Sequence, residues 1–258
     1  MLSYQLNPNY GHLAAVLPKM NERFAQNGTT IYKIRNEIKV LEINGNKLCV
    51  KSFGPPNLIN RYAYAFLRMG KAKRSFYNAY KLREMGVATP EPVAWVEFRD
   101  KHGFISHSYY ISLYEAHTFT LAKVFNNQLP EKEAIIRDFA FYACHILHKQ
   151  GIRHLDLSQG NVLVHKSNNR YSFSLVDINR MRFNSRKTHR NGFSNLRRLG
   201  GSPIEMSMLA NYYAEARQKN PIWGIIQLSL YKLRFQHFRS FKKSILTPLK
   251  TSQLSPNN

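Results

Sequence analysis

The sequence predicts an α+β protein of two lobes, and three observations support this organisation. The part up to residue 115 carries short runs of β-branched and aromatic residues that are separated by turn residues. Residues 116–246 instead carry apolar residues at the spacing of amphipathic helices. A chain of 258 residues with 43% hydrophobic residues has enough apolar material for a core in each lobe. The last residues, 247–258, are rich in Ser, Pro and Asn and are predicted to form a disordered tail.

The first lobe is predicted to be a small antiparallel sheet with one helix. Residues 29–53 are rich in β-branched and aromatic types, and Asn44-Gly45-Asn46 interrupts them as a hairpin turn does, so two or three strands are expected. A helix over residues 71–85 follows, because its apolar residues recur at helical spacing and Gly86 stands where a helix stops. The other elements expected in this lobe are a helix within residues 7–24 and a second hairpin, with strands at 93–98 and 108–116 and a turn at 100–103.

The second lobe is predicted to be mainly helical. Residues 131–151 form a long helix, since apolar residues recur every three or four positions and Gly151 ends the pattern. A loop follows, and then two short strands on either side of a polar break at residues 166–170. Further helices are expected at residues 204–219 and 222–246, of which the second has a strongly basic polar face.

The charge of the chain indicates an anionic partner. Lys and Arg number 38 against 15 Asp and Glu, which gives a formal net charge of +23. Only Glu205 and Glu215 oppose the basic residues between Arg180 and Lys250, and such a field favours an anionic membrane surface. Residues 231–243 interleave aromatic and basic types, as an interfacial helix or a core helix with a solvated basic face would. No RNP-like motif, zinc-ligand spacing or helix-turn-helix pattern favours nucleic acid as the partner.

The composition also excludes several classes of protein. Cys49 and Cys144 are too few for a disulfide framework and lie in apolar stretches, so both are expected to be buried free thiols of a reducing compartment. The N-terminal residues lack the basic-then-apolar pattern of a secretory signal. No window approaches the roughly 18 apolar residues that a membrane span needs. We therefore expect a protein that is soluble or peripheral to a membrane.

The groups that can carry chemistry lie in the loop from His154 to Asn161 and at Asp177, which follows the apolar run FSLV. Phosphoryl transfer needs a carboxylate that receives the proton of the acceptor hydroxyl, and oxygen ligands that hold magnesium on the nucleotide phosphates. We assign Asp156 as the catalytic base, and Asn161 and Asp177 as the metal ligands. His154 is interpreted as a packing and hydrogen-bonding residue of the loop. Taken singly, each Asp or Asn could instead serve an Asx turn or a helix cap.

The segments HLDLSQGN and LVDINRMRF resemble the catalytic loop and the metal-binding segment of the protein-kinase-like phosphotransferases. Among these the chain most resembles the lipopolysaccharide kinase family, the kinases of Kdo and core heptose. The stretches LCVKSF, GVATPEP and YYISLYEAHTFTL support the likeness, which runs from about Thr29 to Leu199. The resemblance implies a bilobal protein-kinase-like fold, with a nucleotide-binding N-lobe over residues 1–115 and a C-lobe over residues 116–246 that holds the catalytic loop.

The resemblance also implies an activity, cofactors and further site residues. The chain is expected to transfer the γ-phosphoryl group of ATP, with Mg²⁺, to a sugar hydroxyl of the lipopolysaccharide inner core, on Kdo or heptose. Lys51 is implied as the lysine that binds the nucleotide phosphates, and the adenine is implied to meet the segment Leu113, Tyr114 and Glu115. A lipopolysaccharide core or Kdo-bearing lipid A acceptor would place the protein peripherally on the cytoplasmic face of the inner membrane.

One part of the family pattern is missing from the predicted sheet. Residues 31–40 contain no glycine-rich loop that could cover the phosphates. Coverage would then come from non-glycine backbone or from the cations Lys33, Arg35 and Lys39.

A second part is missing from the helix that follows. A glutamate that pairs with Lys51 is expected there, yet the suitable positions hold Ser75, Tyr77 and Asn78, and Glu84 lies at the far end. Other functions therefore stay open. They are a kinase of the same fold that acts on a small molecule or a protein, and a pseudokinase or basic binding module without transfer activity.

Overall fold

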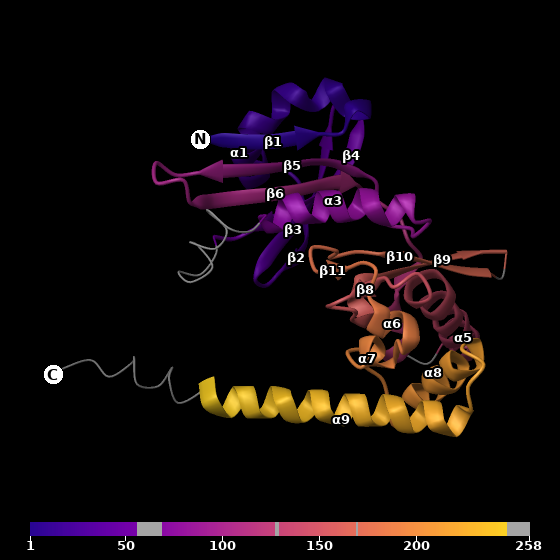
Figure 1. Ribbon diagram of the computed structural model, residues 1–258. Helices are drawn as coiled ribbons and strands as arrows, with labels where there is room; N and C mark the ends of the chain where they lie inside the picture. Colours follow the sequence, from indigo (N-terminus) through magenta and orange to yellow (C-terminus); the bar gives the residue numbers. More distant parts are fainter. Residues whose placement is uncertain (56–68, 127–128, 169, 247–258) are drawn as a thin grey trace. The chain divides into compact units, whose positions relative to one another are not determined.

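The computed structural model describes residues 1–55, 69–126, 129–168 and 170–246, and it has the predicted α+β class (Figure 1). The chain divides into two compact units. The first unit holds residues 1–119, 161–166 and 173–181, and the second holds residues 120–160, 167–172 and the chain from residue 182 onward. The tail predicted at residues 247–258 lies outside the described residues.

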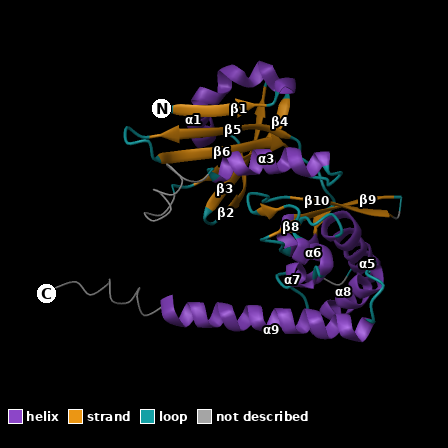
Figure 2. Cartoon of the chain, viewed as in Figure 1, coloured by secondary structure: helices purple, strands orange, loops and turns teal. Residues whose placement is uncertain are grey.

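The first unit is built on a six-stranded sheet with the strand order β1-β5-β6-β4-β3-β2 (Figure 2). Each pair of neighbouring strands is antiparallel. The strands are β1 (Leu2–Leu6), β2 (Thr29–Lys33), β3 (Asn36–Ile43), β4 (Asn46–Phe53), β5 (Pro92–Arg99) and β6 (Ile105–Leu113). Both predicted hairpin regions are confirmed, and β1, which pairs with β5, is an addition to the predicted sheet.

The turn between β3 and β4 falls where the sequence predicts it. Asn44 and Gly45 have φ angles of +47° and +74°, which suit the primed turn that a tight hairpin needs. This turn fixes the register, so Lys51 on β4 lies opposite Tyr110 on β6. Side chains of directly opposed residues lie on the same face of a sheet, and Lys51 and Tyr110 therefore share a face.

One face of the sheet is covered by the helical segments that precede β2. These are the 3₁₀ segment η1 (Pro8–Lys19) and the helix α1 (Met20–Gln26). Leu17 and Phe24 from these segments form a core with Val50 and Ile111 of the sheet. The helix predicted within residues 7–24 is thus mostly 3₁₀ in form, and Pro18, which has no backbone N–H to donate, lies inside it.

The helix α3 (Lys71–Glu84) forms a second core with the sheet and confirms the helix predicted at residues 71–85. Its Phe76 packs with Trp95 and with Tyr110. Because Tyr110 packs in this second core, Lys51 lies on the α3 side of the sheet. A further sheet has the strand order β10-β9-β7, with β7 (Phe119–Thr120), β9 (Val162–Ser167) and β10 (Arg170–Leu175). It confirms the two strands predicted around the polar break.

The second unit is mainly helical, as predicted. The long helix expected at residues 131–151 is α5 (Lys132–Tyr142), which continues as the π-helical segment η2 (Ala143–His148). Two further predicted helices are α8 (Pro203–Ala216) and α9 (Pro221–Leu246). Ser202 and Glu205 form a capping box at the start of α8, which explains why that helix begins there. Short elements complete the chain: α4 (Leu121–Asn126), β8 (Arg153–His154), η3 (Gln159–Asn161), β11 (Met181–Arg182), α6 (Arg186–Arg190) and α7 (Phe193–Leu196).

Across the described part of the chain, every helix is too short or too polar to span a bilayer. Both cysteines are free, as expected. Cys144 is buried and Cys49 is half-buried. Burial raises the pKa of the Cys49 thiol to about 11, although the nearby Lys51 opposes this rise. The Cys49 thiol is therefore protonated at neutral pH, which does not suit a nucleophile.

Candidate active site

The structure joins the predicted phosphate lysine to a predicted metal ligand. Lys51 Nζ donates a hydrogen bond to Asp177 Oδ1 over 2.6 Å, within the first unit. The Lys51 side chain is 12% exposed and that of Asp177 is 30% exposed. The amide of Asn179 donates to the same Asp177 oxygen, also over 2.6 Å. Two donors thus orient one carboxylate whose surface remains partly open to a ligand.

The backbone around Asp177 is held in place by neighbouring elements of the first unit. Asp177 has a φ angle of +55°, a left-handed conformation that is uncommon for a residue with a side chain. On one side of it, Thr89 Oγ1 donates to the Leu175 carbonyl over 2.7 Å. On the other side, the side-chain amide of Asn78 on α3 donates to the Ile178 carbonyl over 2.7 Å. These bonds fix the position of the Asp177 carboxylate. Strand propensity alone would not fix it.

Asn161, the second predicted metal ligand, belongs to the same unit. Its carbonyl accepts a hydrogen bond from the Val176 amide over 3.0 Å, so its backbone lies beside the residue that precedes Asp177. The described residues contain no cluster of three or more His, Cys, Asp or Glu that could hold a metal. One carboxylate and one amide oxygen nevertheless fit Mg²⁺, which commonly takes one or two protein ligands and completes its shell with substrate phosphates and water.

The helix α3 supplies an amide near Asp177 where the family pattern has a glutamate near the lysine. Ser75 on α3 is buried, and its hydroxyl donates a hydrogen bond to the Lys71 carbonyl. The Tyr77 hydroxyl donates to the side chain of Gln5. Glu84 is exposed at the end of the helix. The carboxylate beside Lys51 is therefore that of Asp177 itself.

The three cations considered for phosphate coverage are placed differently. Lys39 Nζ donates to the Phe24 carbonyl over 2.7 Å and lies 5.0 Å from the Phe24 ring, so it fastens α1 to the sheet. Lys33 Nζ lies 3.5 Å from Glu37 at the surface. Arg35, in the turn between β2 and β3, is exposed and remains a candidate.

The segment predicted to meet adenine begins at Leu113, the last residue of β6. The Tyr114 amide donates to the Lys47 carbonyl over 2.8 Å, and Lys47 Nζ lies 4.6 Å from the Tyr114 ring. Glu115 Oε1 lies 2.8 Å from His165 Nε2. Lys47 is thus engaged with this segment. The contact of Tyr114 and Glu115 with adenine stays a prediction.

The predicted base, Asp156, lies in the second unit and has a partner that the sequence analysis did not identify. Arg198 Nη2 lies 2.7 Å from Asp156 Oδ1, and both side chains are about one-third exposed. The Arg198 guanidinium in turn lies 5.1 Å from the ring of Phe235 on α9. The sequence shows Arg198 only as one of many basic residues late in the chain, and it contains no signal for this pairing.

The loop that carries Asp156 is anchored by a buried hydrogen-bond chain within the second unit. The Asn195 side chain donates to the His154 carbonyl over 2.6 Å, and its oxygen lies 3.1 Å from His148 Nε2. Burial lowers the pKa of His148 to about 3, so the ring is neutral at physiological pH. Its Nε2–H therefore donates to Asn195, and its Nδ1 accepts from the Tyr213 hydroxyl over 2.6 Å.

His154 has the structural role that the sequence analysis assigned to it. Its side chain is fully buried, and its Nδ1 accepts a hydrogen bond from the Asp156 amide over 3.1 Å. At the other end of the loop, the Gln159 side chain accepts from the Gly200 amide over 3.1 Å. The loop is therefore held on both sides of Asp156.

The chain is similar to known proteins in sequence and in fold. The model of the lipopolysaccharide kinase (Kdo/WaaP) family matches residues 39–215, which is more than half of the chain. None of the curated proteins matches the sequence. A solved structure of WaaP in complex with acyl carrier protein is similar, with a TM-score of 0.57 and 20% identity over 93% of this chain and 98% of that one.

The kinase-like fold is also shared with a more distant structure. The Rio2 kinase of Chaetomium thermophilum, solved as an ADP/Mg²⁺-phosphoaspartate complex, has a TM-score of 0.50 and 13% identity. The match covers 92% of this chain and 81% of the Rio2 chain. At these identities the two likenesses establish the fold.

Proposed function

Because the chain belongs to the lipopolysaccharide kinase (Kdo/WaaP) family, we propose that it transfers the γ-phosphoryl group of ATP to a sugar hydroxyl of the lipopolysaccharide inner core. Family membership identifies a phosphotransferase that acts on lipopolysaccharide core. The proposal further specifies magnesium-ATP as the phosphoryl donor and Kdo or heptose as the acceptor sugar. The observation that carries it is the 2.6 Å contact between Lys51 and Asp177, with the Asn161 backbone tied beside them.

In this proposal the nucleotide phosphates bind at Lys51, Asp177 and Asn161. Asp177 and Asn161 would hold Mg²⁺ through oxygen atoms, and bound Mg²⁺ neutralises charge on the phosphoryl group that is transferred. Lys51 contacts Asp177 and would bind the phosphates through its ammonium group. The Rio2 relative, which contains ADP and Mg²⁺, supports the pairing of this fold with these ligands.

Asp156 would act on the acceptor. As the hydroxyl oxygen would attack the γ-phosphorus, the bond from that phosphorus to the bridging oxygen would break, ADP would leave, and the hydroxyl proton would pass to the Asp156 carboxylate. The bond between Arg198 and Asp156 orients that carboxylate, and the buried chain from His148 through Asn195 to the His154 carbonyl holds the loop. Arg198 and Asn195 are thus proposed as positioning residues.

One observation favours a second candidate function, which is nucleotide binding without transfer. On α3, the Asn78 side chain donates a hydrogen bond to the backbone after Asp177. The carboxylate that contacts Lys51 comes from Asp177 and not from α3. In this candidate, Lys51 and Asp177 would bind nucleotide phosphates and a cation, and no γ-phosphoryl group would be transferred.

A transfer assay tests the proposal and separates these candidates. Labelled γ-phosphate is followed from magnesium-ATP to an inner-core lipopolysaccharide acceptor that carries Kdo and heptose, and to free sugars in parallel. We expect transfer to the lipid-linked acceptor that is lost in Asp156→Asn and kept in Asp138→Asn, a surface control. Transfer only to free sugars contradicts the acceptor assignment, and nucleotide binding without any transfer favours the second candidate.

We also propose an anionic membrane surface as a partner, which would make the protein peripheral on the cytoplasmic face of the inner membrane. Ile226, Leu230 and Leu233 lie four and three positions apart on α9 and are 51%, 44% and 53% exposed, so they form one apolar stripe. The exposed cations Arg234 and Arg239 lie on the same helix. Apolar insertion together with cationic attraction is what an interfacial helix uses.

A further inference from the structure

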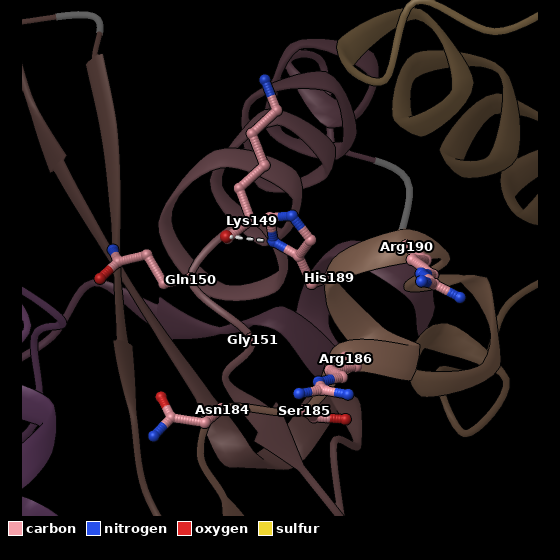
Figure 3. A pocket seen from close by; sticks show the side chains of 8 residues that line it. All are labelled: Lys149, Gln150, Gly151, Asn184, Ser185, Arg186, His189 and Arg190. Atoms are coloured by element: carbon pink, nitrogen blue, oxygen red, sulfur yellow. Dashed lines mark hydrogen bonds between the residues drawn. The ribbon is translucent and has the colours of Figure 1, made fainter.

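The second unit contains a pocket that the proposed transfer chemistry does not use. Its volume is about 350 Å³, and it lies where the segment after η2 meets the helix α6 (Figure 3). The residues that line it come from positions 149–151, 184–186, 189 and 190. Lys51, Asp156, Asn161 and Asp177 are absent from its lining.

The pocket is built on a close approach of two backbone segments. The Ser185 amide donates to the Gly151 carbonyl over 2.9 Å. Gly151 has a φ angle of +70°, and a Cβ atom there would lie 2.9 Å from the Ser185 nitrogen. A glycine is therefore required at this crossing, for conformation and for space.

The α6 side of the pocket is fixed by further hydrogen bonds. His189 Nδ1 lies 2.7 Å from the Lys149 carbonyl, and because a carbonyl only accepts, Nδ1 carries the hydrogen (Figure 3). Ser185 caps α6 through a bond from the Thr188 amide. Arg217 donates to the Arg190 carbonyl over 2.8 Å. Hydrogen bonds thus hold both ends of the short helix α6 in place.

The charged side chains that line the pocket are all basic. Its lining includes Lys149, Arg186 and Arg190, all of which are exposed, and no acidic residue. Arg186 and Arg190 stand one helical turn apart, a spacing at which like charges repel each other. Lys187 adds a further cation to the same five-residue helix, α6. A bound anion would relieve this repulsion.

We propose that this pocket binds a phosphate monoester group. Two arginines, Arg186 and Arg190, line the pocket, whereas Lys149 Nζ lies 3.1 Å from His145 outside it. Two guanidinium groups suit an anion with two charges and three accepting oxygens, because guanidinium groups bind phosphate oxygens in pairs. The volume of about 350 Å³ is larger than a phosphate ion needs, so it also admits part of the molecule that carries the phosphate. A phosphorylated sugar and a phosphomonoester lipid headgroup share this chemistry.

The first experiment measures binding to the full chain by equilibrium dialysis with labelled inorganic phosphate and labelled glucose 6-phosphate. The test variant is Arg186→Gln/Arg190→Gln, and the control with the same charge change is Arg170→Gln/Lys219→Gln, whose residues are exposed and lie outside the pocket. We expect at least about a tenfold loss of affinity in the test variant, since each lost charge-assisted hydrogen bond contributes that much or more. The control should change affinity less than about twofold.

Two further arms identify the source of the phosphate and separate this pocket from the proposed transfer site. A lipid headgroup would be indicated if the protein binds vesicles of phosphatidic acid but not of phosphatidylcholine, and if the test variant loses this binding. A phosphorylated sugar would be indicated by tight binding of glucose 6-phosphate. Lys51→Met should leave binding at this pocket intact even if transfer activity is absent. The proposal is overturned if no probe binds saturably, or if the control variant loses as much affinity as the test variant while thermal unfolding shows both to be folded.

Discussion

Lys51 Nζ and Asp177 Oδ1 are 2.6 Å apart, so the residue predicted to bind phosphates and a residue predicted to bind metal form an ion pair. The two residues are 126 positions apart in the sequence. The pairing explains how a half-buried lysine is accommodated although α3 offers it no glutamate. In the proposed function, nucleotide phosphates would bind Lys51 and a cation would bind Asp177, so this pair would lie at the centre of the transfer site.

Replacement of this lysine should therefore remove transfer while the fold survives. We expect Lys51→Met to reduce the transfer rate by about a hundredfold or more, as loss of a preorganised charge in a site typically does. The pair is partly exposed, so the change in stability should be small. Lys101→Met, at an exposed turn, is the matched control. Equal activity of the two variants in the labelled-phosphate assay would remove Lys51 from the site.

Arg198 should act through Asp156. We expect Arg198→Gln to lower kcat about tenfold or more and to leave the KM for ATP nearly unchanged, because the guanidinium orients the carboxylate at 2.7 Å. Arg198→Lys should restore part of the activity, since it keeps the charge and loses the planar fork. Steady-state kinetics with Arg170→Gln as control test this. A raised KM for ATP with an unchanged kcat would assign Arg198 a different role.

The stability of the protein should fall in mild acid because of His148. The pKa of His148 is lowered by burial to about 3 from 6.5, so the unfolded chain takes up a proton at a pH where the folded chain does not. The stabilising contribution is complete above pH 6.5 and is lost progressively as the pH falls toward 3. The loss is about 2 kcal/mol at pH 5 relative to pH 7.5, at about 1.4 kcal/mol per pH unit.

Urea unfolding at pH 7.5 and pH 5.0 measures this effect. His148→Gln should be less stable at pH 7.5, because it disturbs the bonds to Tyr213 and Asn195, and should show a smaller difference between the two pH values. The exposed histidine variant His237→Gln should keep the wild-type difference. An unchanged pH difference in His148→Gln would show that other groups cause the acid sensitivity.

The apolar stripe of α9 should govern membrane binding. We expect Leu230→Ser/Leu233→Ser to weaken binding to vesicles with anionic lipid by about tenfold or more, because two partly exposed leucines no longer insert. The control Ile31→Ser/Ile204→Ser changes two exposed apolar residues elsewhere, which are 54% and 71% exposed. Co-sedimentation at low and high salt measures the binding. Equal retention of both variants would place the contact on another surface.

The order of the elements and the identity of the motif residues could be predicted from the sequence. Turn residues such as Asn44-Gly45 and the helical spacing of residues 71–85 are local signals, and each determined an element close to its observed bounds. The strand β1 and the 3₁₀ form of residues 8–19 were not predicted. A five-residue edge strand obtains its order from pairing with β5, a partner more than 80 positions away, and local propensity does not contain that information.

The sequence by itself determined the family, the α+β class and the residue types available for phosphoryl transfer, because these depend on residue identity and on short spacings. Only the tertiary structure decided the partners. In the folded chain, Lys51 pairs with the carboxylate of Asp177, and Asp156 pairs with the guanidinium of Arg198. Lys39 donates a hydrogen bond to the backbone of a helix. The physical reason is that an ion pair or hydrogen bond forms between whichever groups the packed chain brings within about 3 Å, and that distance is set by core packing over long sequence separations.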